Sequence, residues 1–136
     1  MMRAFLWMPF LNSKNKEESI MLFLCYPRCG TCRKAREWLD AKKLSYTFRD
    51  IVQDPPTVPE LEEWQKRSEL PLKRFFNTSG MSYRALGLRD KLPGMDEEAA
   101  LELLASDGML VKRPLLVTED VVLIGFRETA WTESLL

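Results

Sequence analysis

The pattern of apolar and polar positions changes period twice near the start of the chain. Residues Met21–Tyr26 (MLFLCY) form a continuous apolar run, which predicts a buried central strand. Residues 31–42 then carry apolar side chains at helical spacing, which predicts an amphipathic helix. Residues 45–51 alternate between apolar and polar and predict a second strand. The short connections favour a right-handed parallel crossover between the two strands.

The middle of the chain is predicted to be helical. Thr57 followed by Glu60 has the spacing of a capping box, with a proline tolerated in the first turn. Further helical segments are predicted at residues 72–76, 83–88 and 96–105, the last capped by Asp96. A helical insertion of about residues 55–108 therefore follows the second strand.

The last part of the chain predicts a hairpin and a terminal helix. Leu115–Thr118 and Val121–Ile124 are two short apolar runs separated by two acidic residues. Residues 128–136 carry apolar side chains four apart, which indicates a short helix. The order is βαβ, a helical insertion, then ββα. It predicts one α/β domain spanning residues 21–136.

Residues 1–20 differ from the rest, with a short apolar patch followed by a polar, charged stretch. The apolar patch is too short to span a membrane and lacks a signal-peptide cleavage pattern. The codons of Lys16-Glu-Glu can form a ribosome-binding sequence shortly before Met21. We therefore expect Met21 to be the native start and the preceding residues to be a translated leader or an extension outside the fold.

Charge and composition exclude several kinds of function. Twenty basic residues balance twenty acidic ones, which argues against direct nucleic-acid binding and against attraction to anionic membranes. The chain has no histidine, which excludes Ser-His-Asp and Cys-His catalysis. With only three cysteines a structural zinc site is not expected, so we expect no metal and no bound cofactor.

Two of the three cysteines form a C-x-x-C motif, Cys29-Gly30-Thr31-Cys32, between the first strand and the first helix. Free N–H groups and the positive end of the helix dipole favour a thiolate at Cys29, making it a nucleophile near neutral pH. Cys32 lies one turn further on the same face and is predicted to resolve a mixed disulfide or an oxidised Cys29. The alternative, that the cysteines are small buried hydrophobes, fits Cys25 inside its strand better than it fits Cys29. Metal binding by the motif would need two more ligands.

Arg113-Pro114, before the predicted hairpin, is the second informative site. A proline that opens a strand after a loop is often cis and cannot donate to the sheet. In thioredoxin-like folds, which this order of elements resembles, such a proline faces the reactive cysteine. Arg113 would then lower the pKa of Cys29 or hold an oxyanion. The alternative is a solvated arginine at the start of a strand.

Three segments together resemble the glutaredoxin-linked arsenate reductase family, to which the Spx-type transcription regulators also belong. They are the C-x-x-C-R-K motif, the Asn77-Thr-Ser-Gly loop with Tyr83-Arg-Ala-Leu, and Lys112-Arg-Pro-Leu-Leu-Val-Thr followed by Ile124-Gly-Phe. The resemblance spans Met21 to about Trp131. It implies a thioredoxin-like fold and a monomer.

The resemblance also assigns roles to site residues. It implies that Cys29 is the nucleophile and that Arg33, Arg113 and the backbone of Gly30 and Thr31 belong to an anion site. The chain departs from the enzymes at Asn77, which stands where the middle helix of the family has an arginine and is expected to take that residue's place in the anion site.

Two further departures follow. Phe126 stands at the position of another family arginine, with Arg127 one residue away, and Cys25 replaces a histidine of some enzymes. Each missing charge-assisted hydrogen bond is worth roughly 1.5–3 kcal/mol, which argues against authentic arsenate reduction.

Two functions follow as alternatives. The first is a cytoplasmic thiol oxidoreductase with Cys29 as nucleophile and Cys32 as resolving thiol, and with glutathione, glutaredoxin or thioredoxin as electron donor. The second is a regulator of the Spx type that binds RNA polymerase, at the C-terminal domain of its α subunit, through a protein surface, with the C-x-x-C pair as its redox switch. The sequence favours the first, because it shows a reactive-cysteine site and no motif for polymerase contact.

Overall fold

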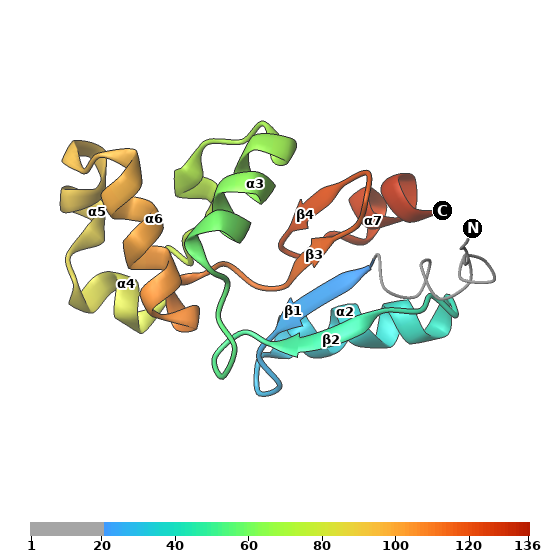
Figure 1. Ribbon diagram of the computed structural model, residues 1–136. Coiled ribbons are helices and arrows are strands. Elements are labelled where there is room, and N and C mark those ends of the chain that lie inside the picture. Colours follow the sequence, from blue (N-terminus) through green and yellow to red (C-terminus); the bar gives the residue numbers. More distant parts are fainter. Residues whose placement is uncertain (1–20) are drawn as a thin grey trace, which may run out of the picture.

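A four-stranded mixed sheet organises the domain in the computed structural model, which describes residues 21–136 (Figure 1). The strands are β1 (Leu22–Cys25), β2 (Thr47–Asp50), β3 (Leu115–Val117) and β4 (Val122–Ile124), in the order β2-β1-β3-β4. β1 pairs with β2 in parallel, and the other two pairs are antiparallel. The expected parallel crossover and the expected hairpin are both confirmed. The prediction of a leader and of a native start at Met21 concerns residues 1–20, which lie outside the described residues.

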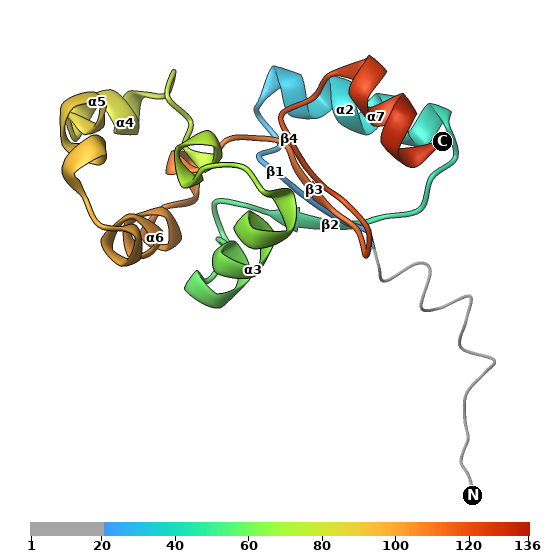
Figure 2. The same cartoon turned by 90° about the horizontal axis from the view of Figure 1, so that it is seen from above.

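Helices cover the sheet on both faces. Figure 2 shows α2 (Gly30–Ala41) and α7 (Glu128–Leu135) on one face and α3 (Val58–Ser68) on the opposite side. The remaining helices of the insertion lie beyond one end of the sheet. They are η1 (Leu72–Phe75), α4 (Met81–Ala85), α5 (Leu88–Lys91), η2 (Leu92–Gly94), α6 (Glu97–Ser106) and η3 (Gly108–Leu110). The βαβ–insertion–ββα arrangement confirms the predicted thioredoxin-like fold.

Alternate residues of the central strands enter two separate cores. Leu24 and Leu115 pack with α3 and the insertion, whereas Phe23, Cys25 and Leu116 pack with α2 and α7. Successive side chains of a strand point to opposite faces of a sheet. Burial on both faces is therefore the reason that the first strand is continuously apolar rather than alternating.

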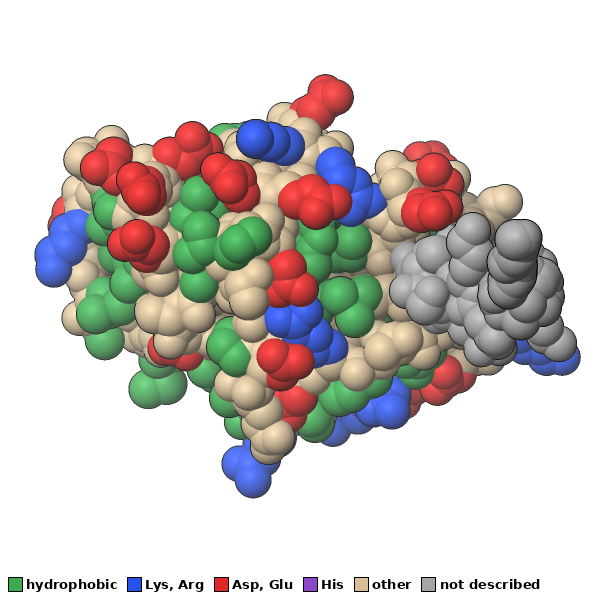
Figure 3. Space-filling view, in the orientation of Figure 1, with side chains coloured by type: hydrophobic (Ala, Val, Ile, Leu, Met, Phe, Trp, Pro, Cys, Tyr) green, Lys and Arg blue, Asp and Glu red, His purple; other side chains and the backbone are tan. Residues whose placement is uncertain are grey.

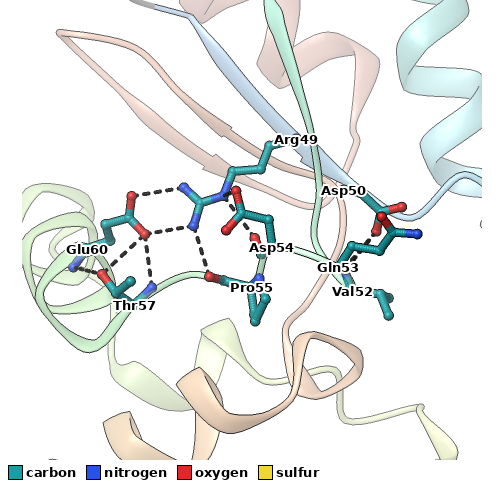
Figure 4. A network of polar contacts seen from close by, with 8 residues as sticks. All are labelled: Arg49, Asp50, Val52, Gln53, Asp54, Pro55, Thr57 and Glu60. Carbon is teal, nitrogen blue, oxygen red and sulfur yellow. Dashed lines mark hydrogen bonds and ion pairs between the residues drawn. The ribbon is translucent and has the colours of Figure 1, made fainter.

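Arg49 of β2 links the sheet to the first helix of the insertion (Figure 4). Its guanidinium donates to both carboxylate oxygens of Glu60 at 2.9 Å and to the carbonyl oxygens of Asp54 and Pro55. Glu60 also accepts from the backbone N–H of Thr57, while the Thr57 hydroxyl accepts from that of Glu60, which confirms the predicted capping box. Hydrogen bonds from Arg49 lower the pKa of the Glu60 carboxyl, and they outweigh burial, which raises it.

The insertion follows its local sequence signals with one difference. Asp96 caps α6 by accepting from the backbone N–H of Ala99, as predicted. The single helix expected over residues 83–88 is instead broken, because Gly87 adopts a left-handed backbone conformation with φ of 66°. Gly87 thus separates α4 from α5, and glycine tolerates the positive φ that this position adopts.

The surface has mixed charge. On the face in Figure 3 acidic side chains gather over the helical insertion, and basic and acidic side chains are interleaved elsewhere. Among residues 21–136, no helix is both long and apolar enough to cross a membrane.

Candidate functional site

Cys29 stands at the junction between β1 and α2. It is the N-cap residue of α2, with an extended backbone (φ −83°, ψ 126°). Its backbone N–H donates to the carbonyl oxygen of Tyr26 at 2.9 Å, which closes the turn through Pro27, and its carbonyl oxygen accepts the first helical bond from Arg33. The first turn of α2 has no acidic side chain, so the partial positive charge of the helix start is left for the thiol.

Opposing effects set the charge state of the half-buried Cys29. Burial is the largest single effect and raises the pKa of the thiol. The backbone N–H groups of Cys32 and Thr31 and the guanidinium of Arg113 act against it by stabilising the thiolate. Their sum prevails, and the pKa of Cys29 lies below its ordinary value. The thiolate is the nucleophilic form, so the site favours the reactive state.

Arg113 approaches Cys29 from the opposite half of the fold. The Arg113–Pro114 peptide bond is cis, as predicted. The guanidinium lies 5.8 Å from the centre of the Tyr26 ring, and its Nη1 donates to the carbonyl oxygens of Met109 and Val111 at 3.4 Å. Its Nε is buried and has no hydrogen-bond partner among the described residues. The Nε donor is therefore unsatisfied within the described residues, and the Arg113 side chain lines the cavity that lies next to it.

A cavity of about 630 Å³ opens beside Arg113. Thr31 and Arg113 contribute to its wall together with η1, the loop after it and the segment after β4. The lining residues include five cationic side chains and no carboxylate within the described part of the chain; the five are Lys73, Arg74, Lys112, Arg113 and Arg127. This size suits an organic ligand of moderate size, and the charge suits an anion.

The other predicted anion-binding residues lie outside this wall. Arg33 is exposed on α2 and borders a much smaller cavity of about 30 Å³ beside Cys32. Asn77 lies against Gly80 in the loop before α4, and its neighbour Thr78 lines the large cavity instead. Gly30 is exposed at the first position of α2. Their roles in anion binding remain predictions.

The structure pairs the cysteines differently from the predicted Cys29–Cys32 couple. Cys32 forms a disulfide with Cys25, with Cα atoms 5.8 Å apart, and Cys29 is free. Cys25 is buried in the core as expected, but it is not an isolated core side chain. The physical reason is strand geometry: Cys25 ends β1 on the face that packs against α2, and Cys32 lies on the buried side of that helix.

Sequence reasoning missed most of the cavity wall. Lys73 and Arg74 come from the insertion, and Lys112 and Arg127 come from the opposite half of the domain. Two adjacent basic pairs, Lys73-Arg74 and Lys112-Arg113, were the only local signal of this cationic wall.

Among residues 21–136, no group of three or more histidine, cysteine or acidic side chains is arranged to hold a metal ion.

The order of elements around the sheet, with an N-cap cysteine next to the arginine that precedes a cis-proline, defines this domain as a thioredoxin-like protein. The ArsC family model matches residues 24–134. An uncharacterized protein of Bacillus subtilis, YusI, is 48% identical over 84% of this chain and 97% of its own length. The chain belongs to the ArsC family.

Relatives with described roles point in two directions. The crystal structure of an ArsC-family-related protein from Bacteroides fragilis is 52% identical, with a TM-score of 0.83 over 85% of this chain and 98% of its own. The regulatory protein MgsR of Bacillus subtilis is 28% identical over 80% of this chain and 85% of its own length. The structure of a possible arsenate reductase from Streptococcus mutans is 50% identical, with a TM-score of 0.76 over 80% of this chain and 92% of its own. The chain is thus similar both to a regulatory protein and to a possible arsenate reductase.

Proposed function

We propose that this protein is a cytoplasmic thiol oxidoreductase in which Cys29 attacks an oxidised sulfur atom of an anionic substrate. The observation that carries the proposal is that Arg113, which stabilises the Cys29 thiolate, also lines the cationic cavity. The thiolate supplies the nucleophile, and the guanidinium of Arg113, which lines the cavity, holds negative charge next to it.

The size of the cavity supports an organic substrate rather than an inorganic oxyanion alone. About 630 Å³ is within the range of pockets that hold ligands of moderate size and far exceeds the room that a tetrahedral oxyanion needs. A small disulfide or mixed disulfide with carboxylate groups would match the size and the charge together. Glutathione, glutaredoxin or thioredoxin would serve as electron donor.

Two small disulfides that differ in charge test this proposal. Reduced protein is mixed with dithiobis(2-nitrobenzoate), which is a dianion, or with uncharged hydroxyethyl disulfide, and Cys29 consumption is followed by quenched alkylation and peptide mapping. The dianion should react faster after correction for its intrinsic reactivity, and Arg127→Gln should slow only the dianion. Lys34→Gln, on the exposed side of α2 outside the cavity wall, is the matched control for loss of one charge.

The pH dependence of the alkylation rate of Cys29 completes the test. The midpoint of the rate curve is expected at lower pH than for an ordinary cysteine. Added arsenate should protect Cys29 only weakly against alkylation. A curve of ordinary position, or equal rates for the two disulfides in wild type and Arg127→Gln, would refute the proposal.

A regulatory function is the second candidate, favoured by the similarity to MgsR. In this case the cysteines would set the conformation of a surface that binds RNA polymerase at the C-terminal domain of its α subunit. Pull-down with that domain, using oxidised and reduced protein, distinguishes the two. Capture in one redox state supports regulation, and no capture in either state argues against it.

A further inference from the structure

The Cys25–Cys32 disulfide lies out of reach of solution. The exposed fractions of the two residues are 1% and 3%, and both belong to the core between the sheet and α2. The cavity beside them measures about 30 Å³ and is bordered by Pro27 and Arg33. That space is enough for a water molecule but not for a thiol reagent or a protein cysteine.

Thiol–disulfide exchange needs a thiolate to reach a disulfide sulfur directly. Cys29 is the one cysteine of residues 21–136 that is both free and partly exposed. It caps the helix in which Cys32 occupies the third position, and the backbone N–H of Cys32 donates to its thiolate. Cys29 is therefore placed next to Cys32 and is the only route within the described chain between the buried pair and an external reagent.

We propose that Cys25 is a third redox cysteine, which takes the disulfide over from Cys29 and stores it in the core as Cys25–Cys32. The proposal rests on the proposed function, since it assumes that Cys29 is the attacking thiol.

The exchange balances in three steps for a substrate disulfide R–S–S–R. The Cys29 thiolate attacks one sulfur, forming a Cys29–S–S–R bond and releasing R–S⁻. Cys32 attacks the sulfur of Cys29, releasing the second R–S⁻ and forming Cys29–Cys32. Cys25 then attacks the sulfur of Cys32 and releases the Cys29 thiolate. Two electrons pass from Cys25 and Cys32 to the substrate, and their two protons end on the two released R–SH groups.

The surroundings of the three sulfurs favour this final arrangement. A neutral disulfide suits the apolar core, which also contains Phe23 and Trp38, whereas a thiolate there would lack solvation. The released Cys29 regains the N–H groups and the guanidinium that stabilise its thiolate. A better stabilised thiolate is also the better leaving group.

Titration of the reduced full chain with dithiobis(2-nitrobenzoate) tests the relay, because each released nitrothiobenzoate is counted by its absorbance. After one equivalent, the reaction is quenched in acid, free thiols are alkylated, and peptides are mapped. Wild type should release two nitrothiobenzoate ions and end with Cys25–Cys32 linked and Cys29 alkylated. Further reagent should then release one more ion from the restored Cys29.

Cys25→Val is the decisive variant, since valine is well tolerated in a strand. It should stop at Cys29–Cys32 after two ions and release no third. Cys25→Ser is the second variant should valine disturb the core, with far-UV circular dichroism confirming the fold of each. Cys29→Ser should slow the reduction of the preformed Cys25–Cys32 bond by external thiol by at least about tenfold, because access to the disulfide is lost.

Wild type that ends as Cys29–Cys32 with Cys25 alkylated would overturn the relay and leave the proposed function intact. Release of the third nitrothiobenzoate ion by Cys25→Val, as by wild type, would also overturn the relay and leave the proposed function intact. Failure of Cys29 to release even the first ion would instead overturn the proposed function.

Discussion

Replacing Gly108 with alanine should destabilise the domain, because two backbone segments lie in direct contact where glycine has no side chain. Gly108 starts η3 and packs on the backbone that follows β2. A β-carbon at this position would lie 1.8 Å from the carbonyl oxygen of Ile51 and 2.7 Å from its carbonyl carbon. Contacts below 3.0 Å essentially never occur for real β-carbons, so the two backbones would have to separate.

Ile51 has little freedom to move away. Its backbone N–H donates to the carbonyl oxygen of Cys25 at 2.9 Å, and its side chain is fully buried. Loss of such a hydrogen bond costs about 0.5–1.5 kcal/mol, and overpacking typically costs about 1–3 kcal/mol. We therefore expect Gly108→Ala to lower the free energy of unfolding by about 2–4 kcal/mol. The backbone of Gly108 is not left-handed, so the cost is steric rather than conformational.

Urea unfolding of the full chain, followed by far-UV circular dichroism, measures this loss. Gly94→Ala is the matched control, since a β-carbon there would meet nothing within 4 Å. The control should leave stability unchanged or raise it by up to about 1 kcal/mol through the unfolded state. A Gly108→Ala protein within about 0.5 kcal/mol of wild type would refute the reasoning, because surface substitutions without consequence fall in that range.

Three further outcomes are expected. Glu60→Gln should lower the free energy of unfolding at neutral pH by about 1–3 kcal/mol, because it removes the charged partner of Arg49. Arg49 lowers the pKa of Glu60 in the folded protein. The stabilisation is therefore complete above the ordinary glutamate pKa of about 4.3 and is lost as pH falls through the pKa of Glu60 in the folded state. A difference in unfolding free energy between Glu60→Gln and wild type that persists in strong acid would contradict this prediction. Arg113→Met should raise the pKa of Cys29 and move its alkylation curve to higher pH, and an unmoved curve would exclude Arg113 as a source of the shift. Asp96→Ala should lower the free energy of unfolding by about 1 kcal/mol, measured by thermal unfolding, because the helix cap is lost. Asp96→Asn should keep most of the stabilisation by the cap.

Local signals in the sequence were sufficient for the elements and for part of the site. The apolar run of β1, the helical spacing after Cys29 and the caps at Thr57 and Asp96 depend on neighbours within a few residues. The cis bond before Pro114 is likewise a property of one dipeptide and its loop. The backbone N–H groups at the start of α2 supply part of the effect that lowers the pKa of Cys29, and this part was predictable from a cysteine at the start of a predicted helix.

Tertiary structure decided the partner of Cys32 and the wall of the cavity. The sequence indicates a C-x-x-C pair, but the packing of α2 on the sheet brings Cys25 to Cys32 and leaves Cys29 free. Lys73 reaches the same cavity as Arg127 only because the insertion folds back beside the end of the sheet. These contacts join residues far apart in the chain, and their distances depend on how helices pack on the sheet rather than on any local period. The sequence by itself therefore determined the position of Cys29 at the start of a helix, and only the folded chain determined which residues surround it.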